Sequence, residues 1–97
     1  MNDEIQVIDS CGNVFLDLGF SSEEATLLKM RADLMNSLRL FIEENQLTQQ
    51  QAAERLGISQ SRVSDLVRGK WDKFSLDMLI ILATRAGKTV RIELEAT

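Results

Sequence analysis

The sequence predicts a single, mostly helical domain of four to five helices with a short β-strand near each end. Three observations support this fold class: apolar residues recur at helical spacing through the middle of the chain, both ends alternate apolar and polar residues, and proline is absent. A chain of 97 residues has room for one hydrophobic core. We divide it into an N-terminal arm, residues 1–22, and a helical domain, residues 23–97.

The N-terminal arm is predicted to be a short strand followed by a turn. Residues 4–8 contain the alternation Ile-Gln-Val, which is typical of a strand. Residues 11–13 are a turn signal, and the apolar patch that follows them ends at Gly19. Cys11 is the only cysteine and has no partner for an internal disulfide, so we interpret it as an incidental thiol.

A long helix is predicted from residue 23 to about residue 45. Ser21 or Ser22 caps its start, and Glu24 completes a capping-box pattern with Ser21. At 1.5 Å per residue this helix is roughly 34 Å long. Its C-terminal half is assigned to the core. Its N-terminal half, residues 25–32, extends beyond the rest of the domain and needs a cover: the N-terminal arm, a second protomer or a bound partner protein.

Residues 47–66 are the most informative stretch and predict two short helices joined by a tight turn. Thr48 is the N-cap candidate of the first helix, and Ser59 is that of the second. Gly57 stands where the chain reverses, at a position that favours a positive φ. The buried side of the second helix consists of Val63, Leu66 and Val67. Its outward side consists of Gln60, Ser61, Arg62, Ser64, Asp65 and Arg68.

This outward side suits DNA better than a protein core. Gln and Arg side chains form paired hydrogen bonds to adenine and guanine in the major groove. The segment is therefore interpreted as a DNA-binding helix-turn-helix, in which the second helix is the recognition helix. The residues assigned to reading bases are Gln60, Ser61, Arg62 and Ser64. Asp65 would repel phosphates, so we expect it to pair with Arg62 or Arg68, or to accept from a cytosine amine.

The residues around the recognition helix are assigned to contacts that fix its position. Arg68, Lys70 and Lys73 follow it and are expected to contact phosphates. Trp71 and Phe74 are assigned to the core or to a lid over helix ends. Residues 50 and 51 are expected to be plain surface. One recognition helix reads only a few base pairs, so we expect a homodimer that binds two half-sites about 34 Å apart.

The C-terminal part is predicted to be a helix followed by a strand. Ser75 caps the helix, which runs to about Ala86, and Gly87 fits the position that ends it. Residues 89–95 alternate with period two, which predicts a strand with one apolar face. Because a lone strand leaves its backbone unpaired, it must pair either with residues 5–8 of the same chain or with its counterpart in a second subunit.

Composition excludes several classes of protein. With no histidine and one cysteine, the chain has neither a Ser-His-Asp nor a Cys-His catalytic set and no Cys/His metal cluster. The adjacent acids at 23–24 and 43–44 point in different directions on a helix. We therefore expect no enzyme activity, no cofactor and no metal. No apolar run approaches the roughly 20 residues of a membrane span, and the polar, acidic start is unlike a secretory signal, so a cytoplasmic protein is expected.

Charge is unevenly distributed along the chain. The net charge of −4 is unusual for a DNA-binding protein. Residues 1–36 carry seven acids against two bases, whereas residues 55–73 carry five bases against two acids. The positive charge is thus concentrated on the recognition helix and the loop after it. The acidic N-terminal third suits a basic partner, although the acids also keep a small protein soluble.

The pattern from Leu47 to Gly69 resembles the Cro and lambda-repressor (XRE) family of DNA-binding domains. The matching positions are Thr48-Gln49, Ala53, Leu56-Gly57, Ser59-Gln60, Val63-Ser64 and Arg68-Gly69-Lys70. The resemblance implies a lambda-repressor-like fold in which Gln60 and Ser61 reach base edges. It also implies that Gln49 bonds a phosphate and buttresses Gln60. Thr48 and Ser59 belong to the same set of phosphate-binding or buttressing residues.

A wider pattern resembles the HigA-type antitoxins within this family, which pair with RelE-like toxins. The residues that carry it are Asn13-Val14-Phe15, Asp17-Leu18-Gly19, Arg31-Ala32-Asp33-Leu34-Met35 and Phe74-Ser75-Leu76-Asp77. This resemblance implies a type II antitoxin that represses its own operon and binds a basic toxin through the acidic N-terminal third. Two alternatives stay open: a stand-alone or phage-derived repressor without a toxin, and an interaction module that has lost DNA binding.

Overall fold

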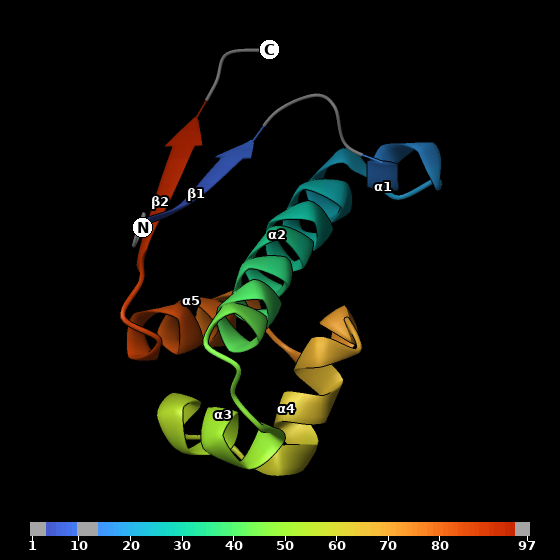
Figure 1. The fold of residues 1–97 in the computed structure, drawn as a ribbon. Coiled ribbons are helices and arrows are strands. Elements are labelled where there is room, and N and C mark those ends of the chain that lie inside the picture. Colours follow the sequence, from blue (N-terminus) through green and yellow to red (C-terminus); the bar gives the residue numbers. More distant parts are fainter. Residues whose placement is uncertain (1–3, 10–13, 95–97) are drawn as a thin grey trace.

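The computed structural model describes residues 4–9 and 14–94 and confirms a mostly helical domain with a strand at each end (Figure 1). In chain order the elements are β1 (Glu4–Asp9), α1 (Val14–Asp17), α2 (Ser22–Glu44), α3 (Gln49–Leu56), α4 (Gln60–Val67), the 3-10 helix η1 (Trp71–Lys73), α5 (Leu76–Arg85) and β2 (Thr89–Leu94). The predicted bounds of the long helix and of the terminal strands agree with these to about one residue. Cys11 and the predicted turn around it lie outside the described residues.

The long helix α2 is the element on which the others assemble. Ser21 caps it as predicted: its hydroxyl oxygen accepts from the backbone N–H of Glu24 at 3.2 Å, and its hydroxyl donates to the Glu24 carboxylate at 2.8 Å. The C-terminal half of α2 is core, because Leu34, Leu38 and Phe41 are buried against α5 and the helices before it. The assignment of this half to the core is confirmed.

The N-terminal half of α2 is covered in part by the N-terminal arm. α1 and β1 both pack on α2, and Ala25 and Leu28 are buried. α1 is a single helical turn in a segment that the sequence identified only as an apolar patch. The Phe15 and Phe20 rings meet edge to face, 6.1 Å apart. Leu27, however, remains 43% exposed, so part of the predicted apolar surface has no cover among the described residues.

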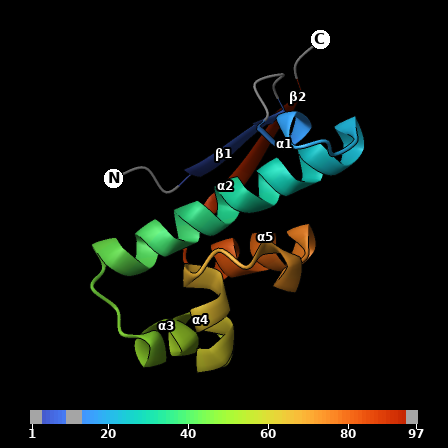
Figure 2. The same ribbon diagram turned by 90° about the vertical axis from the view of Figure 1, so that its right-hand side faces the viewer.

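The two strands pair within one chain as a two-stranded parallel sheet. The register runs from Glu4 opposite Thr89 to Asp9 opposite Leu94. A parallel pair needs a long crossover connection, and here the whole helical part of the chain provides it. The sheet lies beside α2, and β2 rises from the end of α5 (Figures 1 and 2). Of the two pairings left open by the sequence, the structure has the one within the chain.

The apolar face of β2 is only partly covered. Val90 packs against the core, but Ile92 is 46% exposed and Leu94 is 85% exposed. The sequence predicted one apolar face for this strand, and the structure buries only its beginning. The exposed part lies at the end of the sheet that is farther from α5 (Figure 1).

A contact between distant residues fixes α5 to the turn after α3. The Arg85 guanidinium donates from Nη1 to the carbonyl oxygen of Leu56 at 3.0 Å. That carbonyl belongs to the last turn of α3, where helical carbonyls lack intrahelical partners. The next residue, Gly57, has φ of +69°, as predicted for the position where the chain reverses. A Cβ at Gly57 would lie 3.2 Å from Arg85 Nη1.

We expect Gly57→Ala to lower the free energy of unfolding by about 1–2 kcal/mol from the left-handed backbone alone. Displacing Arg85 from Leu56 adds roughly 0.5–1.5 kcal/mol for the lost hydrogen bond. Gly69→Ala is the matched control, because Gly69 has φ of +72° and its added Cβ would meet nothing within 4 Å. Urea unfolding measures both. Equal losses for the two variants would show that the Arg85 contact contributes nothing to stability.

Candidate nucleic-acid interface

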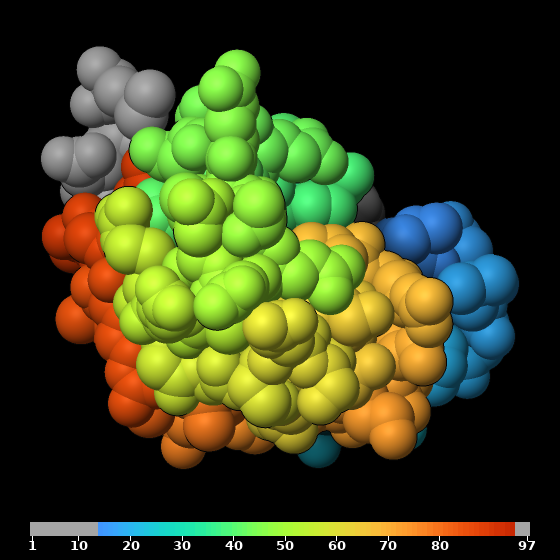
Figure 3. Space-filling view, turned by 60° about the horizontal axis from the view of Figure 1, so that its bottom comes forward, coloured from blue at the N-terminus to red at the C-terminus, as the bar shows by residue number. Residues whose placement is uncertain are grey.

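Helices α3 and α4 form one surface at the end of the molecule away from the sheet, and Figure 3 views the molecule from that side. Each helix begins at its predicted capping residue. Thr48 Oγ1 accepts from the backbone N–H of Gln51 at 3.1 Å, and Ser59 Oγ accepts from the backbone N–H of Arg62 at 3.2 Å. These bonds, together with the turn at Gly57, fix the start and the direction of both helices.

Gln51 has a role that the sequence interpretation missed. It was expected to be plain surface, and its side chain is exposed, but Gln51 Oε1 accepts from the backbone N–H of Thr48 at 2.9 Å. The two reciprocal bonds make a complete capping box at the start of α3. The signal was present in the sequence, because Thr48 followed by a Gln three residues later is a capping-box pattern.

The four predicted base-reading residues lie on α4 with two degrees of exposure. Gln60 and Ser61 are exposed at the first turn of the helix, whereas Arg62 and Ser64 are half-buried. The opposite side of α4 packs into the core through Val63 and Leu66, as predicted. The polar side of the helix is therefore not packed into the interior of the chain.

Arg62 does not extend freely into solvent. Its guanidinium carbon lies 4.7 Å from the centre of the Phe74 ring, in a cation–π contact. Phe74 is 2% exposed, so its assignment to the core rather than to base stacking is confirmed. A contact of this kind contributes about 0.5–1 kcal/mol at an exposed site. Arg62 is thus held against the buried Phe74 ring.

The ion-pair partner expected for Asp65 was wrong, whereas its alternative role as an acceptor from a cytosine amine stays a prediction. The sequence suggested Arg62 or Arg68, one helical turn away on either side, but the ion pair is with Lys70, at 3.7 Å between Nζ and Oδ1. The backbone explains the difference: Gly69 adopts a positive φ, and the N–H of Lys70 donates to the carbonyl of Asp65 at 3.0 Å. This turn folds Lys70 back over the last turn of α4.

The residues predicted to contact phosphates all lie at the surface. These exposed residues are Thr48, Gln49, Ser59, Arg68, Lys70 and Lys73. Gln49 and Gln60 both belong to the described part of the chain, and no hydrogen bond joins them there. A shallow hollow between α3 and the start of α4 is lined by Gln50, Glu54 and Gln60, among others. The buttressing of Gln60 by Gln49 therefore stays a prediction.

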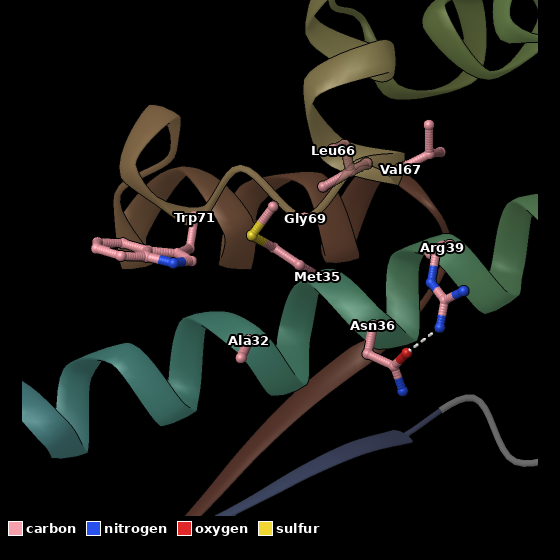
Figure 4. Close-up of a pocket in the computed structure, with 8 residues that line it drawn as sticks. All are labelled: Ala32, Met35, Asn36, Arg39, Leu66, Val67, Gly69 and Trp71. Carbon is pink, nitrogen blue, oxygen red and sulfur yellow. Dashed lines mark hydrogen bonds between the residues drawn. The ribbon is translucent and has the colours of Figure 1, made fainter. Parts of the chain in front are cut away.

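A pocket of about 190 Å³ lies between α2, the end of α4 and η1. Figure 4 shows Met35 and Leu66 on its apolar walls, with Trp71 at one end and Arg39 at the other. Trp71 is 37% exposed, so it is a partial lid rather than core. Arg39, which the sequence interpretation did not single out, hydrogen-bonds Asn36 and lies 3.6 Å from Glu43. Arg39 thus places a further guanidinium at the pocket that Gly69 and Trp71, on either side of Lys70, also line.

Among residues 4–9 and 14–94, no three Cys, Asp or Glu side chains come together as metal ligands would. Within the same residues, every helix is too short or too polar to cross a bilayer.

Comparison with protein families bears on this surface. A family model described as a helix-turn-helix domain matches residues 14–95, which include all the described helices and β2. A search of curated proteins finds no match for the chain. The family match thus spans the α3–α4 surface together with the elements that support it.

Proposed function

Because the chain belongs to this helix-turn-helix domain family, we propose that it is a sequence-specific DNA-binding regulator that represses transcription by occupying promoter DNA. The observation that carries the proposal is the capped, solvent-facing polar side of α4, with Gln60 and Ser61 exposed at its first turn. The N-terminal residues of a recognition helix contact base edges when the helix lies in the major groove. The proposal includes no catalytic activity.

Base reading is assigned to the outward side of α4. Gln60 and Ser61 reach base edges first, and Ser64 lies one turn further along the same side. Arg62 bonds guanine after its guanidinium leaves the Phe74 ring. Since that ring holds Arg62 in the folded protein, the loss of the cation–π contact offsets part of the gain from the base contact.

Phosphate binding is assigned to residues at the two edges of the same surface. The hydroxyls of Thr48 and Ser59 and the amide of Gln49 lie at the starts of α3 and α4, where helix dipoles favour anions. Arg68 lies at the C-cap of α4, Lys70 follows it, and Lys73 ends η1. These contacts fix the position of the protein on the duplex and do not read sequence. Two half-sites imply that the protein binds as a homodimer.

The finer proposal is that this protein is an XRE-type antitoxin of the HigA kind, acts in the cytoplasm and binds a basic, RelE-like toxin. Two features support a partner site in the N-terminal third, residues 1–36. Residues 1–22 of this third form the arm. That third carries seven acids against two bases within residues 1–36. It also exposes apolar side chains at Leu16, Leu18 and Leu27. Acidic and apolar surface together fit a basic protein better than DNA.

Arg62→Ala should weaken binding to the operator by about 1–3 kcal/mol and relax the preference at one base pair, because a bidentate guanine contact is lost. Arg62→Lys keeps the charge but not the bidentate geometry, so it should also lose base preference. Fluorescence anisotropy with operator and scrambled duplexes measures both effects. Unchanged discrimination in the two variants would remove Arg62 from the base-reading set.

Lys70→Ala should weaken binding to all sequences alike and reduce the slope of log affinity against log salt by about 0.9, the value for one phosphate contact. Asp65→Asn should instead strengthen binding to all sequences, because it removes an acid from the interface and releases Lys70. Lys29→Ala is the control: it makes the same charge change on α2, where Lys29 pairs with Asp33. A loss confined to one sequence would move Lys70 into the base-reading class.

For the antitoxin proposal, we expect a small basic protein, encoded beside this chain, to co-purify with it from the native host. Neutralising exposed acids of the N-terminal third, with Asp17→Asn and Glu23→Gln, should weaken that association. The matched control, Glu44→Gln with Asp77→Asn, neutralises two exposed acids elsewhere and should leave it unchanged. Equal effects of the two double variants on the association, measured by calorimetry, would contradict a toxin site in the N-terminal third.

A further inference from the structure

Strand β2 has one edge open to pairing. β1 occupies its other edge, and no further strand pairs with it among the described residues. The open edge presents backbone N–H and C=O groups that favour addition of another strand. A two-stranded sheet is also marginal by itself, whereas three or more strands with an apolar face are stable. The exposed Ile92 and Leu94 supply apolar surface next to this edge.

The residues of β2 are self-complementary in the antiparallel direction. Val90–Leu94 reads apolar, cationic, apolar, anionic, apolar, with Ile92 at the centre. Two antiparallel copies aligned with Ile92 opposite Ile92 place Arg91 of each strand opposite Glu93 of the other. The same alignment places Val90 opposite Leu94. Both pairings are favourable, because side chains opposite each other in such a pair have Cβ atoms about 4.5–5.5 Å apart.

Neighbouring registers lack this complementarity. Centring the pair on Arg91 sets two arginines opposite each other, and centring it on Glu93 sets two carboxylates opposite each other. Sliding one strand by a single residue from the register centred on Ile92 sets apolar residues opposite charged ones. The register centred on Ile92 also uses charges that already attract, since Arg91 Nη2 lies 3.1 Å from Glu93 Oε1 within the strand. In the paired strands the four side chains form one ring of alternating charge.

We propose that β2 is the homodimer interface of this protein, formed by antiparallel pairing of two β2 strands about a twofold axis at Ile92. The result is a continuous four-stranded sheet in the order β1–β2–β2–β1. A twofold interface requires a surface that is complementary to itself, and the charge order of β2 provides one. The inference rests on the dimer of the proposed function and names its surface, but its test needs no DNA.

Charge exchange tests the pairing and its register. Arg91→Glu and Glu93→Arg each set like charges opposite each other twice, so each should raise the dimer dissociation constant on the order of tenfold. Mixing the two variants should restore association, because both cross-strand pairs become attractive in the heterodimer. Analytical ultracentrifugation measures the three samples. Glu44→Arg, which makes the same charge change as Glu93→Arg at the far end of α2, should dimerise like the unaltered chain.

Disulfide trapping tests the position of the axis. In a Cys11→Ser background, Ile92→Cys should form an intermolecular disulfide under mild oxidation, because only the residue on the axis faces its own copy. The Cα separation across an antiparallel pair, about 4.5–5.5 Å, is within the range of a disulfide. Arg91→Cys and Glu93→Cys should cross-link poorly alone and efficiently when mixed with each other.

The results separate this inference from the proposed function. A chain that is monomeric at all concentrations, or variants that dimerise as the unaltered chain does, would overturn the β2 interface. Operator binding by the same samples is measured in parallel. If binding persists while the strand pairing fails, β2 is not a dimer interface and the regulator assignment is unaffected. If the strands pair but no DNA is bound, the regulator assignment fails instead.

Discussion

The orientation of α4 depends on the burial of Val63 and Leu66, which are 0% and 1% exposed. At about 100° per residue, these two positions define one side of the helix and leave the other side to the solvent. Each fully buried side chain of this type stabilises the fold by about 1.5–3 kcal/mol relative to an exposed one. A rotation of α4 that buried Gln60 or Ser61 would lose this stabilisation and bury polar groups. The outward polar surface is therefore a consequence of core packing.

Local signals in the sequence predicted the elements well. Helix periodicity and the capping residues Ser21, Thr48, Ser59 and Ser75 gave the helix starts, because a cap acts on N–H groups within its own first turn. The positive φ of Gly57 followed from its place between two helical patterns. These features depend on residues close in sequence, so no knowledge of the tertiary fold was needed.

The side-chain contacts of the candidate site were not predictable in the same way. Arg62 and Arg68 are the right partners for Asp65 on an isolated, continuing helix. The chain instead turns at Gly69 and brings Lys70 to Asp65. The contact of Arg62 with Phe74 and the bond from Arg85 to Leu56 join residues 12 and 29 positions apart, so both depend on how whole elements pack. The sequence thus predicted which residues surround α4 but not which of them hold one another.

The pairing of β1 with β2 joins the two ends of the chain. The acidic N-terminal third and the strand proposed as the dimer interface share one set of backbone hydrogen bonds. The arm is therefore not a separate appendage: any partner that draws β1 away from the sheet leaves β2 with two open edges, and any strand added to β2 extends the same sheet. Two-stranded sheets gain stability when strands are added, so dimerisation at β2 also favours the pairing of β1 with β2. Under these proposals, binding at the N-terminal third and dimerisation are coupled through β1, even though α3 and α4 lie at the other end of the molecule (Figure 1).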